Sequence, residues 1–180
     1  MVIQRMIDVI DSVSESVGRF VSWLLLLMVL LICYDVGMRY LFQSGSVALQ
    51  ELEWHIFSLV FLLGAAYTMK HGDHVRVDVF YQSRFMNERH RAMVDFIGGL
   101  IFLLPFCILV IVGSLPFIES AYNFSEGSPD PGGLPYRFIL KAAIPFGFFL
   151  LLLQGVAAML RSLQVLRAGK ESSSSQQSIK

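Results

Sequence analysis

The sequence contains few charged residues. Asp, Glu, Lys and Arg together make up 16% of its 180 residues, whereas soluble proteins carry about 25%. Hydrophobic residues make up 55%, and a soluble chain of this composition would expose large apolar patches and aggregate. A lipid bilayer is the better solvent for such a chain. The formal net charge is zero and nucleic-acid-binding motifs are absent, so we expect no nucleic-acid partner.

Cysteine and catalytic motifs are also scarce. The two cysteines, Cys33 and Cys107, lie in apolar runs and are expected to act as small hydrophobic residues. The chain has no nucleophile elbow, P-loop or zinc-helix motif, so nothing in it argues for an enzyme. Only His55 lies inside an apolar run, whereas a haem held in a membrane bundle needs axial ligands there. The anchor subunit of a redox enzyme is therefore disfavoured, and we expect no cofactor.

Histidine and aspartate gather in one short stretch. His71, Asp73, His74 and Asp78 are residue types that bind metals, but their order follows no recognised metal-site spacing. We therefore expect no metal ion.

Four apolar stretches are long enough to cross a membrane. They cover residues 20–42, 48–69, 94–118 and 138–160. A hydrocarbon core about 30 Å thick needs about 20 apolar residues in a helix. The sequence therefore predicts an all-α integral membrane protein with a single four-helix domain over residues 1–167. The Ser- and Gln-rich segment 168–180 is predicted to be a disordered tail.

Two further segments are candidates for helices at the membrane interface. Residues 1–17 are amphipathic, because apolar side chains recur at helical spacing with polar ones opposite. This pattern predicts an interfacial helix that leads into the first span, and the alternative is a frayed cytoplasmic tail. Residues 80–89 form the second candidate.

Basic residues are distributed unequally between the two sides of the predicted membrane. The termini and the loop 70–91 hold eleven of the 14 Lys and Arg residues, and the other side holds Arg39, Arg137 and Lys141. The positive-inside rule then places both termini and the basic loop in the cytoplasm. The start of the second span and the loop 119–137 face outward.

Charged side chains near the ends of the spans are candidate partner-contact residues. Asp35 and Arg39 lie four residues apart, so they share a helix face and can pair. Glu51 and Glu53 lie in the first turns of the second span, where the helix dipole favours carboxylates. No span has a charged residue at its midpoint, where a carrier with its own ion site usually has polar groups or a broken helix. These four residues either contact a partner protein or touch headgroups and water.

A period-two pattern follows the second span. The valines of the segment 75–79 alternate with Arg76 and Asp78. In an extended segment the two sets point to opposite sides, and His74 joins the polar set. We predict that the polar set holds the cytoplasmic loop and that the valines pack against the membrane helices. The alternative is a flexible linker.

The loop before the fourth span is rich in proline and glycine, which predicts a fixed, non-regular turn. Its candidate residues are Asp130, Pro131, Gly132, Gly133, Leu134, Pro135, Tyr136 and Arg137. A turn with little freedom to lose favours contact with a partner. Arg137, at the base of the turn, either shapes the external surface or anchors the fourth span at the headgroups.

Several of these motifs resemble the small membrane subunit of tripartite ATP-independent periplasmic (TRAP) transporters. The family pattern has two acidic residues, an apolar helix with Gly-Ala, and Gly-x-His-hydrophobic-x-Val-Asp. Here it corresponds to Glu51 and Glu53, Leu62–Ala66 and Gly72–Asp78. One departure is Leu52, which separates two acids that are adjacent in many members. The pattern therefore leaves open which acid makes the contact typical of the family.

A second signature supports the same resemblance. Ser128–Arg137, followed by Lys141, Pro145, Gln154 and Gly155, is similar to the branch often labelled for mannitol or chloroaromatic compounds. The resemblance covers residues 20–161, which is nearly the whole of the predicted folded part.

The resemblance implies a multi-pass protein of the bacterial inner membrane with two protein partners besides membrane lipids. One partner is a periplasmic substrate-binding protein. The other is a large membrane subunit that carries the sodium sites and moves the substrate by an elevator motion. The small subunit is then an accessory scaffold in the sodium-dependent symport of an organic acid or similar small solute. The alternative is a self-sufficient, homo-oligomeric exporter or channel, for which only Ser58, Gln154 and kinks at Pro105 and Pro145 offer a polar path.

Overall fold

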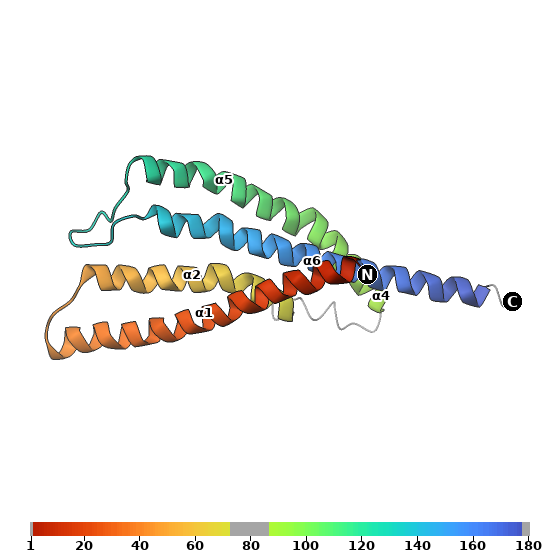
Figure 1. Ribbon diagram of the computed structural model, residues 1–180, viewed down its shortest axis with the longest axis horizontal. Coiled ribbons are helices and arrows are strands. Elements are labelled where there is room, and N and C mark those ends of the chain that lie inside the picture. The colour runs from red at the N-terminus through yellow and green to blue at the C-terminus, as the bar shows by residue number, and fades with distance from the viewer. Residues whose placement is uncertain (1, 73–86, 178–180) are drawn as a thin grey trace.

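The computed structural model describes residues 2–72 and 87–177, with side-chain positions as far as Arg167. Within these ranges the regular structure is helical throughout, which confirms the all-α prediction. The helices are α1 (Val2–Leu41), α2 (Val47–His71), α4 (Glu88–Gly98), the π-helical stretch η1 (Gly99–Leu103), α5 (Leu104–Asn123) and α6 (Phe138–Gln177) (Figure 1).

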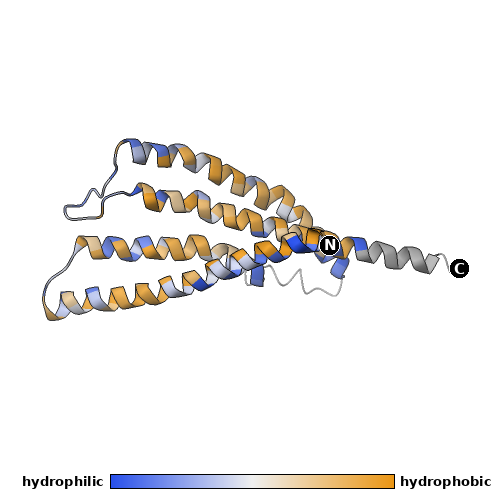
Figure 2. Cartoon of the chain, in the orientation of Figure 1, coloured by the Kyte–Doolittle hydropathy of each residue, from blue (hydrophilic) through white to orange (hydrophobic). Residues whose placement is uncertain are grey.

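Four helical segments are long and apolar enough to span a membrane, which confirms the predicted four-span fold. They are Val2–Leu41, Val47–His71, Glu88–Asn123 and Phe138–Arg167. Figure 2 shows hydrophobic residues along most of their length, with hydrophilic residues concentrated toward the ends. Each segment extends beyond the predicted span at one end at least. From Val2 on, the amphipathic segment continues directly into the first span, so these residues belong to the 40-residue helix α1 and do not form a separate element.

The helices form two hairpins that open toward one end of the molecule. The loops 42–46 and 124–137 lie at this loop end, and the N-terminus and the last turns of α6 lie at the opposite, terminal end (Figure 1). In the order α5, α6, α2 and α1, each helix packs against the next, and α1 also contacts α6. This arrangement brings the start of α2 and the loop 124–137 to the same end, as the sequence predicts.

The core is small and lies where α1, α2 and α6 meet. It contains Leu63, Ala66 and Leu150, with Val17 and Val21 packed against them. The backbones of α2 and α6 approach closely at Gly147. A Cβ atom on this residue would lie only 2.9 Å from the carbonyl oxygen of Leu62. Close approach of this kind is typical of packing between membrane helices.

The third span changes its helical geometry before a proline. In η1 the N–H of Leu104 donates to the carbonyl of Gly99, five residues earlier. Pro105 follows this turn within the continuous helical segment Glu88–Asn123, where a proline cannot donate to the carbonyl four residues earlier and its ring clashes with that carbonyl. The π-helical turn therefore accommodates Pro105, while Pro116 and Pro145 lie inside α5 and α6.

The fourth span starts at Phe138, as predicted, but its helix continues to Gln177. The helix thus enters the segment 168–180, whose composition predicts a tail. The boundary of the folded domain at residue 167 and the disorder of the tail both stay predictions.

Candidate functional site

Glu51 is the centre of a polar cluster at the loop end. It lies in the second turn of α2, and only 3% of its surface is exposed. Its Oε1 accepts a hydrogen bond from the hydroxyl of Ser128, and its Oε2 accepts one from the backbone N–H of Leu134 at 2.6 Å. Arg137 Nη2 lies 3.8 Å from Oε1. One carboxylate of α2 thereby holds both ends of the loop that precedes α6.

The loop is also ordered by its own hydrogen bonds. The N–H of Ser128 donates to the carbonyl of Leu134 at 3.0 Å, and the N–H of Gly133 donates to that of Asp130 at 3.1 Å. Gly132 has a φ of 82°, in the left-handed region that favours glycine. The loop has a defined conformation for these reasons, and its role stays a prediction.

Gly133 is required by the closeness of the Glu51 cluster. A Cβ atom at this position would lie 2.3 Å from Ser128 Oγ and 2.8 Å from Glu51 Oε2. The composition of the loop predicts a turn, but local sequence patterns do not show that the turn closes on Glu51. The participation of Ser128 and of the Leu134 N–H was therefore missed.

The other predicted contact residues of this end lie on α1 and α2. Arg39 donates to Asp35 Oδ2, so these two residues form the pair that their spacing allows. Asp35 is 1% exposed, and its Oδ1 is buried without a hydrogen-bond partner in the described part of the chain. Glu53 Oε1 is likewise buried without a hydrogen-bond partner among the described residues. Glu51 and Glu53 therefore differ: Glu51 binds the chain's own loop, and Glu53 retains an unused buried oxygen.

Three predicted residues cannot be placed. His74, Arg76 and Asp78 lie outside the described residues, as does most of the segment 80–89. Their proposed role in holding the loop after α2 stays a prediction.

A buried polar network at the terminal end was not predicted. Gln154 of α6 is fully buried and accepts a hydrogen bond from Ser14 Oγ at 2.8 Å. Its amide donates to Asp11 Oδ1 at 3.1 Å, and Arg161 donates to both oxygens of Asp11. The residue in the sequence that could have indicated this network is Gln154, because an amide inside an apolar span needs hydrogen-bond partners.

An ion pair joins the same half of α1 to α2. Lys70 Nζ donates to Glu15 Oε2 at 2.5 Å. The amphipathic pattern of residues 1–17 predicts a helix at the membrane interface, and this stays a prediction. In the structure, Asp11, Ser14 and Glu15 of its polar face contact α6 and α2. The polar face holds helices together because α1 crosses both of them at this end.

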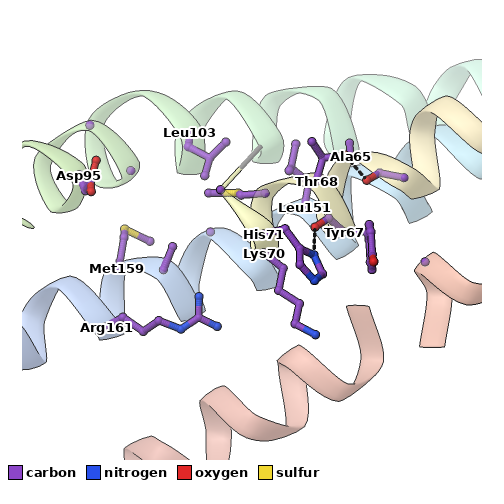
Figure 3. Close-up of a pocket in the computed structure, with 18 of the residues that line it drawn as sticks. Ala65, Tyr67, Thr68, Lys70, His71, Asp95, Leu103, Leu151, Met159 and Arg161 are labelled. Atoms are coloured by element: carbon purple, nitrogen blue, oxygen red, sulfur yellow. Dashed lines mark hydrogen bonds between the residues drawn. The ribbon is translucent and has the colours of Figure 1, made fainter. Parts of the chain in front are cut away.

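A large groove of about 1530 Å³ lies near this network, between α2 and the third and fourth spans. Figure 3 shows Leu103, Leu151 and Met159 along it, with Lys70 and Arg161 toward one side. The described residues contain no group of three His, Cys, Asp or Glu side chains that could hold a metal ion. The walls are largely apolar, so the groove suits hydrocarbon or another apolar surface.

Comparison with known proteins identifies the family. Residues 28–165 match the model of the DctQ component of tripartite ATP-independent periplasmic transporters. The chain belongs to this family. It is 32% identical over 122 residues to the "Putative TRAP transporter small permease protein" of Haemophilus influenzae, covering 67% of this chain and 74% of that relative. It is 28% identical over 163 residues to the C4-dicarboxylate TRAP transporter small permease protein DctQ of Vibrio cholerae, covering 79% and 69% respectively.

Membership confirms the resemblance drawn from the sequence motifs. This DctQ-family chain is a subunit of a TRAP transporter located in the inner membrane, and the family is not enzymatic. The family also implies, in general terms, a complex with a large membrane subunit and a binding protein. Assignment to the mannitol or chloroaromatic branch stays a prediction.

Proposed function

We propose that this chain is the accessory scaffold of a sodium-dependent TRAP symporter that imports an organic acid or similar small solute. A periplasmic binding protein delivers the solute, and the large membrane subunit contains the transport and sodium sites. The small subunit braces the stationary part of that large subunit. The name of the Vibrio cholerae relative, which mentions a C4-dicarboxylate, supports a carboxylate substrate.

The observation that carries the proposal is the uncovered apolar surface of a thin helical layer. Phe57 and Phe61 on α2 are 57% and 71% exposed, and Phe102 and Leu109 on the third span are 74% and 69% exposed. Lipid or protein must cover these side chains, and a layer of four helices offers a broad surface to a larger membrane protein. Gln154, a fully buried polar residue of the fourth span, already uses its amide on Ser14 and Asp11. It is therefore a poor lining for a transport path.

The two buried carboxylate oxygens support contact with a partner near the loop end. Asp35 Oδ1 and Glu53 Oε1 lack hydrogen-bond partners among the described residues, and an unpaired buried acceptor costs about 1–3 kcal/mol. We propose that a basic residue of the large subunit donates to Glu53, which as a whole residue is partly exposed. We place this contact on the α1–α2 hairpin.

The distribution of basic residues supports an orientation with the loop end outside and both termini in the cytoplasm. The ordered loop 128–137 would then share the periplasmic side with the binding protein. We propose that the exposed part of this loop forms part of the docking surface.

Reconstitution into liposomes tests the proposal. The chain alone is expected to give no sodium-driven solute uptake, because the proposal places the transport and sodium sites in the large subunit. Together with its large subunit and binding protein, it should support uptake that requires all three components and a sodium gradient. Robust uptake or efflux by the chain alone would instead favour the self-sufficient exporter or channel.

A further inference from the structure

Arg137 has an unused hydrogen-bonding capacity. A guanidinium carries five N–H donors, but the side chain of Arg137 donates no hydrogen bond within the described residues. Its Nη2 lies 3.8 Å from Glu51 Oε1, beyond hydrogen-bond range, and its Cζ lies 5.6 Å from the centre of the Trp54 ring. Only 23% of the side chain is exposed. A partly buried guanidinium that donates no hydrogen bond among the described residues favours an anionic acceptor.

An apolar cleft of about 480 Å³ opens beside Arg137, between α2 and the α5–α6 hairpin. Its apolar walls are formed by Trp54, Phe57, Phe61, Leu62, Phe117, Leu140 and Ile144. Ile144 lies seven residues after Arg137, about 10 Å along α6. One leaflet of a hydrocarbon core is about 15 Å deep, so the cleft follows most of the depth of one leaflet.

A second cation lies at the mouth of the cleft but is already neutralised. Lys141 Nζ donates to Glu126 Oε2 at 2.5 Å and lies 3.6 Å from the centre of the Phe117 ring. Glu51 and Glu126 balance Arg137 and Lys141, so the mouth has no excess charge that would attract a free dianion strongly. Its specific feature is one guanidinium, above an apolar cleft, whose N–H donors make no hydrogen bond within the described residues.

We propose that this cleft binds a glycerophospholipid of the leaflet at the loop end. The phosphate accepts hydrogen bonds from the Arg137 guanidinium, and one acyl chain lies against Phe57, Phe61 and Leu140. A phosphodiester offers acceptor oxygens with only a single negative charge. This suits a guanidinium that is ion-paired with Glu51 but donates no hydrogen bond among the described residues. An acyl chain fills a cleft that an isolated inorganic anion would leave open. The lipid also bridges α2 and α6 at the level of the Glu51 cluster.

Native mass spectrometry of the full chain in detergent tests the site by titration with palmitoyl-oleoyl-phosphatidylglycerol. The wild-type chain should retain one tightly bound lipid. Arg137→Gln, which removes the charge, should weaken this binding about tenfold, because a charge-assisted hydrogen bond is lost. Arg5→Gln changes an exposed arginine at the terminal end and should leave binding unchanged.

A second pair of variants keeps Arg137 and tests the cleft. Leu140→Trp fills the cleft and should weaken lipid retention about tenfold, whereas Ile139→Trp should not, because Ile139 is 64% exposed and lies outside the cleft. This pair of variants tests the lipid site even in the case that Arg137→Gln does not fold. Equal retention of palmitoyl-oleoyl-glycerol, which lacks the phosphate, would overturn the role of Arg137. Competition by inorganic phosphate as strong as that by the phospholipid would show a simple anion site and would also overturn the proposal.

Discussion

At the scale of single residues, Glu51 connects two parts of the chain that are distant in sequence. It accepts hydrogen bonds from Ser128 and Leu134 and lies near Arg137. Hydrogen bonds to a charged group are stronger than those between neutral groups. Glu51 therefore determines where the loop 128–137 lies relative to α2.

Glu51→Ala should lower the free energy of unfolding by about 2 kcal/mol, because two hydrogen bonds to a carboxylate are lost. It should also make the loop 128–137 more accessible to protease. Thermal unfolding in detergent and limited proteolysis measure the two effects. Glu119→Ala is the control, because Glu119 is exposed. Equal protease resistance in the two variants would contradict the role of Glu51 in the loop.

Gly133→Ala should also destabilise the loop and lower the free energy of unfolding by about 1–3 kcal/mol. The reason is that its methyl group would overlap Ser128 Oγ and approach Glu51 Oε2. Gly127→Ala is the matched control in the same loop, because a Cβ atom there meets nothing within 4 Å. Hydrogen exchange of the loop amides compares the two variants. If Gly127→Ala accelerates exchange as much as Gly133→Ala, the effect arises from glycine replacement in general.

At the scale of helices, the terminal half of α1 is held by polar contacts. Asp11 and Ser14 bind α6 through Gln154 and Arg161, and Glu15 binds Lys70 of α2. The apolar core shared by these helices is small. Hydrogen bonds between helices therefore contribute to their arrangement, each worth about 0.6 kcal/mol on average and up to about 1.7 kcal/mol in a membrane protein.

Gln154→Leu should weaken the packing of α1 on α6 by about 1–2 kcal/mol, because Ser14 and Asp11 lose their amide partner. Hydrogen exchange in α1 should rise in its first half and remain unchanged near Asp35. Gln164→Leu is the control, because Gln164 is exposed and its contact with Gln4 is 3.5 Å long. Uniform exchange along α1 in both variants would contradict the network's role.

At the scale of the whole molecule, the four helices form a layer with little interior. Most of its apolar surface faces outward, and its polar clusters lie at the two ends. The loop end contains the Glu51 cluster, and the terminal end contains the Gln154 network. This division suits a subunit whose faces contact lipid or a larger membrane protein and whose loop end meets a soluble partner.

Asp130→Lys tests docking at the loop end. Asp130 is exposed, and only its backbone takes part in the loop's hydrogen bonds, so the assembled membrane complex should form normally. Uptake that depends on the binding protein should fall several-fold, because the charge at the loop tip is reversed. Glu88→Lys, an exposed change at the terminal end, should have no effect. Normal uptake in Asp130→Lys would show that the loop tip is not part of the docking surface. Loss of the complex would show that the loop serves folding.

Local patterns in the sequence were sufficient for much of the fold. Four apolar runs predicted the spans because each run alone must satisfy the thickness of a bilayer. The spacing of Asp35 and Arg39 predicted their pair, because a helix places residues four apart on one face. The prolines and glycines of the loop predicted a turn because their backbone preferences are local.

The sequence by itself thus determined the all-helical class, the number of candidate membrane spans and the shared end of the loops 42–46 and 124–137. Only the tertiary structure decided which polar groups meet. Ser128 is 77 residues from Glu51, and Gln154 is 140 residues from Ser14, and no period of a helix or turn relates positions so far apart. A buried polar group must find a partner, but which helix supplies it depends on the packing. For the same reason, the amphipathic pattern of residues 1–17 could not predict that its polar face contacts α6 and α2.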